Sequence, residues 1–583
     1  MYEESSVFQD MRFLRFQLSI LPILPYCLGL AFLAVLASHA FLLPGFPITH
    51  ESPGPGVINS AHWLLQVDKN VMTGSIPNWC PDEFEAGVPC FNYYPPLAYY
   101  VAELFHLCGF MLVDSVKLTF VLSYLLSGLA MFFFISAITH NTVAGLISGI
   151  AYEYAPYHFV DSLIRGDLSE SFAFVFLPIV FYFACRSTQG STNNARNAVL
   201  GGLFLGLLIL THNITAYIVL LVLCVLALCH SVSIRRPLPL LSLLLAVFVA
   251  LSVTAYYWIP AFVELKYVNP GVLALGRWEI FYLSLRRMIL PFPANWNGQA
   301  GWSAGWASGG IESPLTLGTA GLLSLTFCVP IVAWKRTRIV MYFLSTLMLS
   351  VLFASEVGWF VVLHLPFGRF VQFGYRFLII GAFASAALLG LSTKELGHLI
   401  GSRGWCSRRR ATGVLSLILI FVLLASSHQY LYPPAGYMSA WAANNFRGPD
   451  HWEYLPQGAR PLGQAIPDVS TNAGEVALVR KTATHWVAAS KSSTESNVTF
   501  KIYKFPGWRV YVDGAAQEML TNSSYGLIQV EVPQGYHMIE AVYSDTFPRL
   551  LGKIITVFAM LGMIAWQLLI SSKRLQGRVS VDV

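Results

Sequence analysis

Charged residues are scarce in this chain, and their scarcity argues against most classes of soluble protein. Asp, Glu, Lys and Arg make up 11% of the 583 residues, whereas apolar residues make up 55%. This balance is typical of an integral membrane protein with several spans. The formal charge of +6 is small for this length, and Lys and Arg gather at the ends of apolar runs, which suits topology signalling. We therefore expect a lipid bilayer, and no nucleic acid, as a partner.

Other common features are also missing. The nine cysteines show no zinc-type spacing, and Cys80 and Cys90 would pair in the first loop if that loop faced an oxidising compartment. The first apolar run is about as long as a bilayer crossing and lacks a convincing cleavage site, so we expect no cleavable signal peptide. Transporters typically have internal repeats and ionisable residues near mid-membrane. This sequence shows no long repeat and few such residues, which argues against a transporter.

Apolar runs long enough to cross a bilayer predict a polytopic α-helical membrane protein with about twelve or thirteen transmembrane helices. A weaker run, 142–158, carries Glu153, Pro156 and His158, and we expect it to be re-entrant or interfacial. By the positive-inside rule, both termini lie in the cytoplasm and the main outer loops are 44–91 and 263–314. The twelve stronger runs lie at 17–43, 92–113, 115–138, 168–186, 197–211, 212–231, 238–262, 315–334, 339–356, 374–394, 411–428 and 549–571.

The chain divides into three parts: a transmembrane domain over 1–430, a β-rich domain over 431–547, and a final helix with a cytoplasmic tail over 548–583. In the second part, Val, Tyr and Ile alternate with polar residues between Pro-Gly and Asp-Gly turns. This pattern predicts an antiparallel β-sandwich, and the topology places it outside the cytoplasm.

The first candidate for chemistry is the pair His50 and Glu51, which follows the first apolar run in the stretch ITHESPGPG. The Pro-Gly run fixes the backbone just beyond them, so Glu51 would be held at the membrane surface. Partial desolvation there raises the pKa of a carboxylate and suits a general base. The alternative is an ordinary solvated loop acid.

A second candidate group stands at the start of the 168–186 run and contains Asp161, Arg165, Asp167 and Glu170. Charged clusters at the edge of an apolar slab typically face a cavity or a ligand. The planar fork of Arg165 would clamp a phosphate. The alternative is a salt-bridged helix cap.

Three more outer features add candidate binding residues. His212 interrupts an apolar hairpin, and Trp302 lies in a Trp-rich stretch that suits either an interfacial belt or stacking on a sugar. Arg369 and Arg376 stand at the outer boundary, against the positive-inside bias. An anionic lipid phosphate would explain them.

Together with Trp79-Cys-Pro-Asp82, the entry to the second run at 87–97, and Gln372-Phe-Gly-Tyr-Arg-Phe377, these residues resemble the C-type membrane glycosyltransferase superfamily (GT-C). Within it, the chain is most similar to bacterial YfhO-like and "6-pyruvoyl-tetrahydropterin synthase-related" membrane proteins. The phrase FPGWRVYVDG at 505–514 resembles the β-domain of that group.

The resemblance implies a glycosyltransferase of the bacterial plasma membrane. It would transfer a sugar from a polyprenyl-phosphate-linked donor to a glycan, lipid or protein acceptor on the extracytoplasmic face. Glu51 maps onto the catalytic base and Asp161 onto a second family acid, with Asp167 as its rival. The implied substrate-binding residues are His50, Arg165, Asp167, Glu170, His212, Trp302, Arg369 and Arg376.

Two points stay open on the sequence. Some superfamily members use a divalent metal such as Mg or Mn, but no dense carboxylate set here forces one. The alternative function is a non-catalytic scaffold or a lipid-glycan transporter of envelope assembly.

Overall fold

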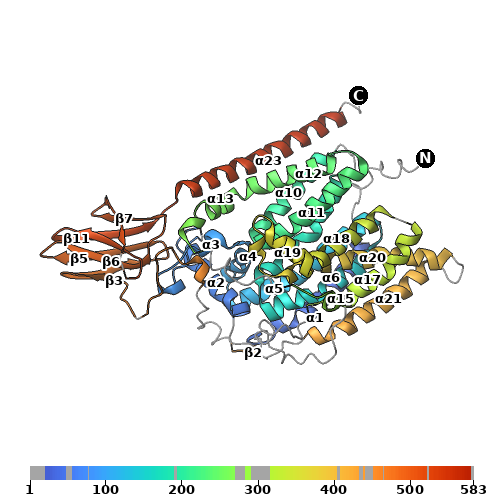
Figure 1. The fold of residues 1–583 in the computed structure, drawn as a ribbon, viewed down its shortest axis with the longest axis horizontal. Coiled ribbons are helices and arrows are strands. Elements are labelled where there is room, and N and C mark those ends of the chain that lie inside the picture. Colours follow the sequence, from blue (N-terminus) through green and yellow to red (C-terminus); the bar gives the residue numbers. More distant parts are fainter. Residues whose placement is uncertain are drawn as a thin grey trace.

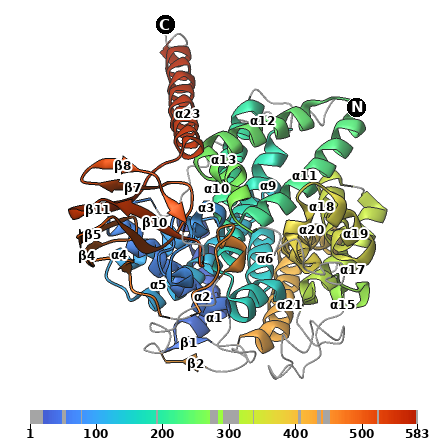
Figure 2. The same cartoon turned by 60° about the vertical axis from the view of Figure 1, so that its left-hand side comes forward.

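The fold is a bundle of helices with a β-sandwich at one end (Figure 1). A second view shows the same separation of strands from helices, with α23 (Phe547–Val579) extending away from the sandwich (Figure 2). The computed structural model describes residues 20–47, 55–76, 78–188, 193–269, 282–289, 315–335, 337–402, 408–431, 437–439, 451–463, 465–521 and 524–579.

Most of the predicted crossings coincide with apolar helices. Length and composition support six spans in the described chain, or eight if two bent pairs each count as one. This is fewer than the twelve or thirteen expected, partly because three other helices have apolar parts of only 10–17 residues, namely Pro22–Ala37, Gly318–Val329 and Thr412–Ser427. The six are α5 (Leu112–Thr139), the α8–α9 stretch (Leu168–Arg186), α10 (Asn194–Thr211), α11 (Asn213–Ile234), the Gly374–Gly397 stretch that includes most of α20 (Leu378–Ser402), and the first part of α23.

The bent pairs and the shorter helices account for the rest of the apolar runs. In the pairs, the two helices meet at 80° and 81°. The pairs are α12–α13 (Leu238–Val253 and Ala255–Val263) and α18–α19 (Arg338–Ala354 and Glu356–His364), and the shorter helices are α1 (Ile20–Ala37), α17 (Gly318–Lys335) and α21 (Arg408–Ser427). Every predicted crossing except 92–113 therefore has a matching helix.

The predicted crossing at 92–113 was wrong. After α3 (Cys90–Tyr93) the chain forms α4 (Leu97–Leu107), whose 11 residues reach only about 16 Å. Two prolines precede this helix, and Gly109, at φ 99°, separates it from α5. Hydropathy sums apolar residues across such breaks, whereas a crossing needs an unbroken helix.

The weaker run 142–158 is not among the candidate spans of the described chain. It contains the 12-residue helix α6 (Thr142–Glu153), which packs against α5 and α20; that it is re-entrant or interfacial stays a prediction. The polar residues that lower its hydropathy are buried against other helices; Glu153, for example, is fully buried.

The predicted β-sandwich is confirmed. One sheet has the order β3-β6-β10-β9 and the other β4-β5-β11-β7-β8, and alternate residues such as Val498, Phe500 and Ile539 fill the core between them. The strands are β3 (Val469–Thr471), β4 (Glu475–Lys481), β5 (His485–Ser492), β6 (Ser496–Tyr503), β7 (Trp508–Val512), β8 (Ala515–Gln517), β9 (Leu520–Thr521), β10 (Leu527–Val532) and β11 (Gly535–Tyr543).

The loop after α2 (Pro55–Val71) completes the core of the sandwich. Trp79 from this loop is buried, with its ring centroid 5.5 Å from that of Trp508 and 5.2 Å from that of Tyr543. Gly87, at φ 78°, lies directly beneath the indole, and a Cβ there would come within 2.3 Å of the ring nitrogen. A disulfide joins Cys80 to Cys90 and closes the loop, as the isolated pair in the sequence indicated.

A buried ion pair ties α13 to the start of α23. Nη2 of Arg549 lies 2.8 Å from Oε2 of Glu264, and both side chains are 2% exposed. The amide of Asn92 donates to the same carboxylate oxygen at 2.9 Å, and Arg549 also donates to the Pro506 carbonyl at 3.0 Å. This contact fixes the first loop, the sandwich and the last helix relative to the bundle.

Candidate functional site

The predicted cluster at 157–170 forms at a break between helices. After α7 (Pro156–Phe159), residues Val160–Arg165 form one turn of π-helix, and Gly166 takes the left-handed conformation (φ 58°). Asp167 then caps α8 (Leu168–Ala173), its Oδ1 accepting from the Glu170 backbone N–H at 2.9 Å. π-helical turns are frequent at functional sites, and this one brings the charged side chains together.

Arg165 lies at the centre of the cluster. It donates to Glu170 Oε2 at 2.6 Å and to Asp167 Oδ2 at 3.1 Å, and it also pairs with Asp161. Its guanidinium lies over the ring of Tyr375, 5.5 Å from the centroid. The alternative of a helix cap is thus correct for Asp167, but the cap is part of a larger buried network.

Glu170 connects this cluster to Arg376. Nε of Arg376 lies 3.4 Å from Glu170 Oε2, and the Tyr157 hydroxyl donates to Oε1 at 2.8 Å. Arg376 is fixed in turn by the Val371 carbonyl at 3.0 Å and by the side chain of Gln372 at 3.2 Å. Two of the arginines singled out in the sequence therefore meet in one buried network.

His212 joins the cluster from the break between α10 and α11. It caps α11 by accepting from the Thr215 backbone N–H through Nδ1. A ligand atom of His212, one of Asp167 and one of Glu170 all lie within 4.8 Å of one another. These three residues have the spacing of a possible metal site.

The donor set fits a divalent cation poorly. Both oxygens of Glu170 already interact with Tyr157, Arg165 and Arg376. A cation at this position would lie beside two guanidinium groups and would have to displace them. We therefore assign no metal-dependent step to the cluster.

A cavity of about 270 Å³ opens beside the cluster. Its wall is largely aromatic and includes two charged groups of the cluster, Arg165 and Asp167. The lining residues are Asn59, Ser60, Trp63, Tyr94, Tyr99, Arg165, Gly166, Asp167, Phe373, Tyr375, His451, Glu453 and Tyr454. Flat aromatic rings with a few convergent polar groups are typical of small-molecule sites.

The structure places the two rival acids differently. Asp161 is fully buried and paired with Arg165, and it does not line the cavity. Asp167 lines the cavity, with 15% of its side chain exposed. Arg369 is exposed on the short helix Gly368–Val371 and is not part of the cavity wall. His50, Glu51 and Trp302 lie outside the described residues.

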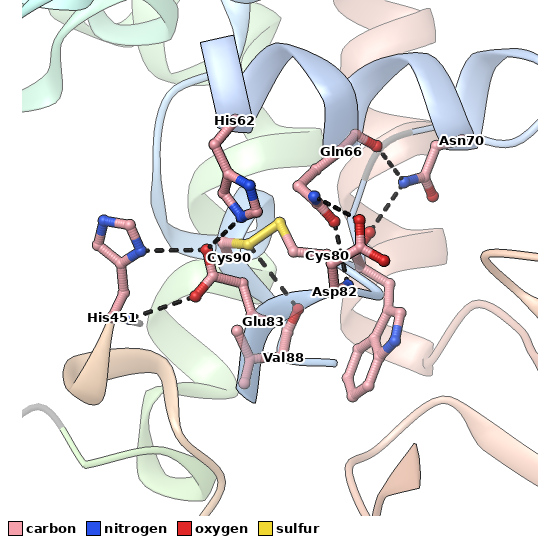
Figure 3. Close-up of a disulfide and its surroundings, with 10 residues drawn as sticks. His62, Gln66, Asn70, Cys80, Asp82, Glu83, Val88, Cys90 and His451 are labelled. Atoms are coloured by element: carbon pink, nitrogen blue, oxygen red, sulfur yellow. Dashed lines mark hydrogen bonds and ion pairs between the residues drawn. A yellow bond between two sulfur atoms is a disulfide. The ribbon is translucent and has the colours of Figure 1, made fainter. Parts of the chain in front are cut away.

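Sequence reasoning missed one wall of the cavity. Trp63 on α2 lines it together with His451, Glu453 and Tyr454. Glu83 contacts His451 (Figure 3). The 44–91 loop was correctly singled out for its acids and aromatics, but nothing in the sequence connects it to His451.

Glu83 is a buried acid between two histidines. Its Oε1 lies 3.3 Å from Nε2 of His62 and 3.2 Å from Nδ1 of His451. Burial alone would raise the pKa of Glu83, but the hydrogen bonds with these histidines lower it to about 2. The carboxylate is therefore ionised throughout the physiological range.

Solved structures of low identity resemble this chain. ArnT from Cupriavidus metallidurans bound to undecaprenyl phosphate is 13% identical with a TM-score of 0.41, over 70% of this chain and 74% of that one. The oligosaccharyltransferase AglB from Archaeoglobus fulgidus, in complex with an inhibitory peptide and a dolichol-phosphate, is 13% identical with a TM-score of 0.41, over 76% and 61%.

A third structure, an Archaeoglobus fulgidus oligosaccharyltransferase in complex with Zn and sulfate, is 15% identical with a TM-score of 0.35, over 70% and 54%. The chain thus spans less than two thirds of the length of either archaeal structure. A comparison with curated proteins gives no match.

A family model also matches the chain directly. Residues 91–280 match the 6-pyruvoyl-tetrahydropterin synthase related domain, described as a membrane protein. The matched range includes the π-helical turn, Arg165, Asp167, Glu170 and His212. About a third of the chain is thus similar to a domain named in the sequence analysis, and the protein is a multi-pass membrane protein.

Proposed function

We propose that the protein is a membrane glycosyltransferase. It transfers a sugar from a polyprenyl-phosphate-linked donor to an envelope glycan, lipid or protein acceptor on the extracytoplasmic face of a plasma membrane. The observation that supports this most is the aromatic cavity into which Arg165 and Asp167 open, at the end of a helical bundle.

Arg165 is the group that would meet the donor phosphate. Asp161 and Glu170 hold its guanidinium from the buried side, and Asp167 pairs with it at the cavity, at 3.1 Å. Of these three acids, Asp167 is the most exposed, so a phosphate can replace it as a partner of Arg165. Arg376 is a second guanidinium held near Arg165, since both contact Glu170.

In the reaction, an acceptor hydroxyl attacks the anomeric carbon of the donor sugar. The bond between that carbon and the phosphate oxygen breaks, and the phosphate leaves with the electron pair. Arg165 stabilises the charge that develops on the leaving group. The hydroxyl proton passes to a carboxylate, for which we propose Glu51. In support, Asn59 and Ser60, in the helix that begins four residues after Glu51, line the cavity.

The disulfide between Cys80 and Cys90 supports the assignment of the face. Disulfides persist in oxidising compartments and are rare in the cytosol. The disulfide loop lies beside the cavity wall, because Glu83 within it contacts His451. We therefore propose that the cavity opens away from the cytoplasm.

One observation favours the transporter alternative. Glu153 is buried inside the bundle, and neither of its carboxylate oxygens has a hydrogen-bond partner among the described residues. Buried acids in membrane helices commonly mark proton or ion pathways. Glu153→Gln would abolish a proton-coupled transport activity, whereas it should leave sugar transfer by the cavity residues largely unchanged.

The test of the proposed function uses the purified full chain in lipid nanodiscs. Undecaprenyl phosphate linked to glucose, mannose or N-acetylglucosamine is supplied with an envelope extract as acceptor, and release of undecaprenyl phosphate is followed by mass spectrometry. We expect release with the wild type and at least ~100-fold less with Arg165→Ala, with Arg369→Ala as the control. No release by the wild type with any of the three donors would contradict the proposal.

A further inference from the structure

Two segments that are far apart in the sequence form opposite parts of one cavity wall. Asn59, Ser60 and Trp63 come from α2, and His451, Glu453 and Tyr454 come from the segment that precedes the β-sandwich. The indole of Trp63 lies edge-on to the ring of His451, with centroids 4.8 Å apart. The shape of the cavity therefore depends on where the segment 451–454 is held.

Glu83 is the residue that holds this segment. Its Oε1 lies 3.2 Å from the His451 ring nitrogen Nδ1, and its Oε2 accepts from the His451 backbone N–H at 3.3 Å. One carboxylate thus fixes both the backbone and the ring orientation of His451. In Figure 3 the other ring nitrogen of His451 points away from Glu83.

Glu83 is itself held rigidly. The disulfide between Cys80 and Cys90 and the backbone bridge from Cys80 to Val88 close the loop around it. The neighbouring Asp82 accepts from Gln66 on α2 at 2.9 Å and pairs with Lys69. Only 1% of the Glu83 side chain is exposed. Because Glu83 is fixed by its surroundings, it determines the position of His451 rather than following it.

The wall that Glu83 supports has the chemistry of a sugar site. Trp63 lies against Tyr94 with ring centroids 4.4 Å apart, and Tyr454 stacks on Tyr93 at 5.9 Å. Aromatic faces accept the apolar face of a sugar ring, while groups such as His451 and Glu453 can bond its hydroxyls. This combination is unnecessary for a bare lipid phosphate.

We propose that Glu83 is a positioning residue for sugar recognition: through His451 it holds the segment 451–454 against the cavity, so that His451 and Glu453 contact the hydroxyls of the saccharide on the lipid donor. The inference rests on the proposed function and adds the residues that bind the sugar. It separates them from Arg165, which meets the phosphate.

The experiment measures two affinities for each variant of the full chain in nanodiscs, by native mass spectrometry. The probes are undecaprenyl phosphate and the same lipid phosphate carrying glucose, mannose or N-acetylglucosamine. We expect the wild type to prefer at least one sugar-linked lipid over the bare one. Glu83→Gln and His451→Ala should reduce that preference about 5-fold, the effect of one lost hydrogen bond, and leave the affinity for bare undecaprenyl phosphate unchanged.

The matched control is His485→Ala, which removes a histidine paired with Glu540 at 3.2 Å on the β-sandwich. This variant should change neither affinity.

An unchanged preference for the sugar-linked lipid in His451→Ala, or an equal loss of affinity for both lipids, overturns the proposal. Equal binding of the bare and sugar-linked lipids by the wild type also overturns the proposal, but it does not contradict the proposed binding of the lipid phosphate. Failure of the wild type to bind even bare undecaprenyl phosphate instead rejects the proposed function as well. An unchanged preference in a folded Glu83→Gln variant also overturns the proposal; if Glu83→Gln fails to fold, Glu83→Asp, which keeps the charge but has a shorter reach to His451, is measured in its place.

Discussion

Arg165 and Arg376 share one carboxylate oxygen of Glu170. Their guanidinium nitrogens lie 2.6 and 3.4 Å from Oε2, although one arginine belongs to a π-helical turn and the other to the short helix Gly374–Phe377 that directly precedes α20. Two cations held by one buried acid are fixed relative to each other. The positions of both guanidinium groups therefore depend on Glu170, within a cluster that also contains the acids Asp161 and Asp167.

The first prediction concerns Arg376. Arg376→Ala should weaken binding of undecaprenyl phosphate by about 10-fold or more, and Arg376→Lys should weaken it less, because lysine keeps the charge but not the planar fork. Binding is measured by native mass spectrometry in nanodiscs. Arg369→Ala, at an exposed arginine nearby, is the control. Equal and negligible effects of both Arg376 variants would remove this residue from the phosphate site.

The second prediction concerns the base. Glu51→Gln should reduce sugar transfer by at least ~100-fold, because general-base catalysis contributes roughly 10²–10⁴-fold. Donor binding should change little, so the loss should appear in kcat rather than in KM. Glu475→Gln, an exposed acid on the sandwich, is the control. Unchanged turnover would exclude Glu51 and make Asp167 the next candidate.

The third prediction concerns metal. Treatment with a chelator should leave donor binding and transfer unchanged, because the carboxylate of Glu170 is already occupied by a tyrosine and two arginines. Turnover is compared before and after dialysis against EDTA and after addition of Mg²⁺ or Mn²⁺. One equivalent of metal that copurifies with the wild type and is lost in His212→Ala would show that the cluster rearranges around a cation.

The fourth prediction concerns pH and Glu83. Its pKa in the folded protein, about 2, lies below the ordinary value of 4.5. The ionised form therefore stabilises the fold: the contribution is complete above about pH 4.5 and disappears as the pH falls towards 2. It amounts to about 3 kcal/mol at most.

Glu83→Gln should accordingly lower the apparent melting temperature by several degrees at pH 7, and the difference from wild type should shrink below pH 4.5. Differential scanning fluorimetry in detergent measures it. Glu85→Gln, in the same loop but exposed, is the control. A difference that stays constant down to pH 3 would contradict the assignment.

The fifth prediction concerns the buried pair of Glu264 and Arg549. Arg549→Ala should destabilise the protein by about 3–5 kcal/mol, because it leaves a buried carboxylate uncompensated. The double variant Glu264→Gln with Arg549→Met should recover part of the loss. Lys553→Ala removes a more exposed pair with Asp545 and should cost about 1 kcal/mol or less. Unfolding is followed by fluorimetry and by limited proteolysis between the bundle and the sandwich.

Much of the fold could be predicted from the sequence, because hydropathy and strand alternation are local patterns. Asp161, Arg165, Asp167 and Glu170 were also found, since they are neighbours within one turn and its helix cap. Arg376 was found because its charge is unusual at an outer boundary.

The errors have physical causes. At 92–113 the apolar residues were counted across two prolines and Gly109, which interrupt the helix. Glu83 and His451 were missed because only the folded chain brings them together. No local pattern distinguishes such an acid from the solvated acids beside it.

Trp79 has a consequence for how the protein is made. The sandwich lacks one of its core side chains until this tryptophan, synthesised several hundred residues earlier, enters from the first loop. The first loop therefore stays without its packing partners while the intervening helices are synthesised. A mutation that delays the last strands would leave both the indole and the unfilled core of the sandwich exposed to water, where chaperones and proteases recognise incomplete assembly.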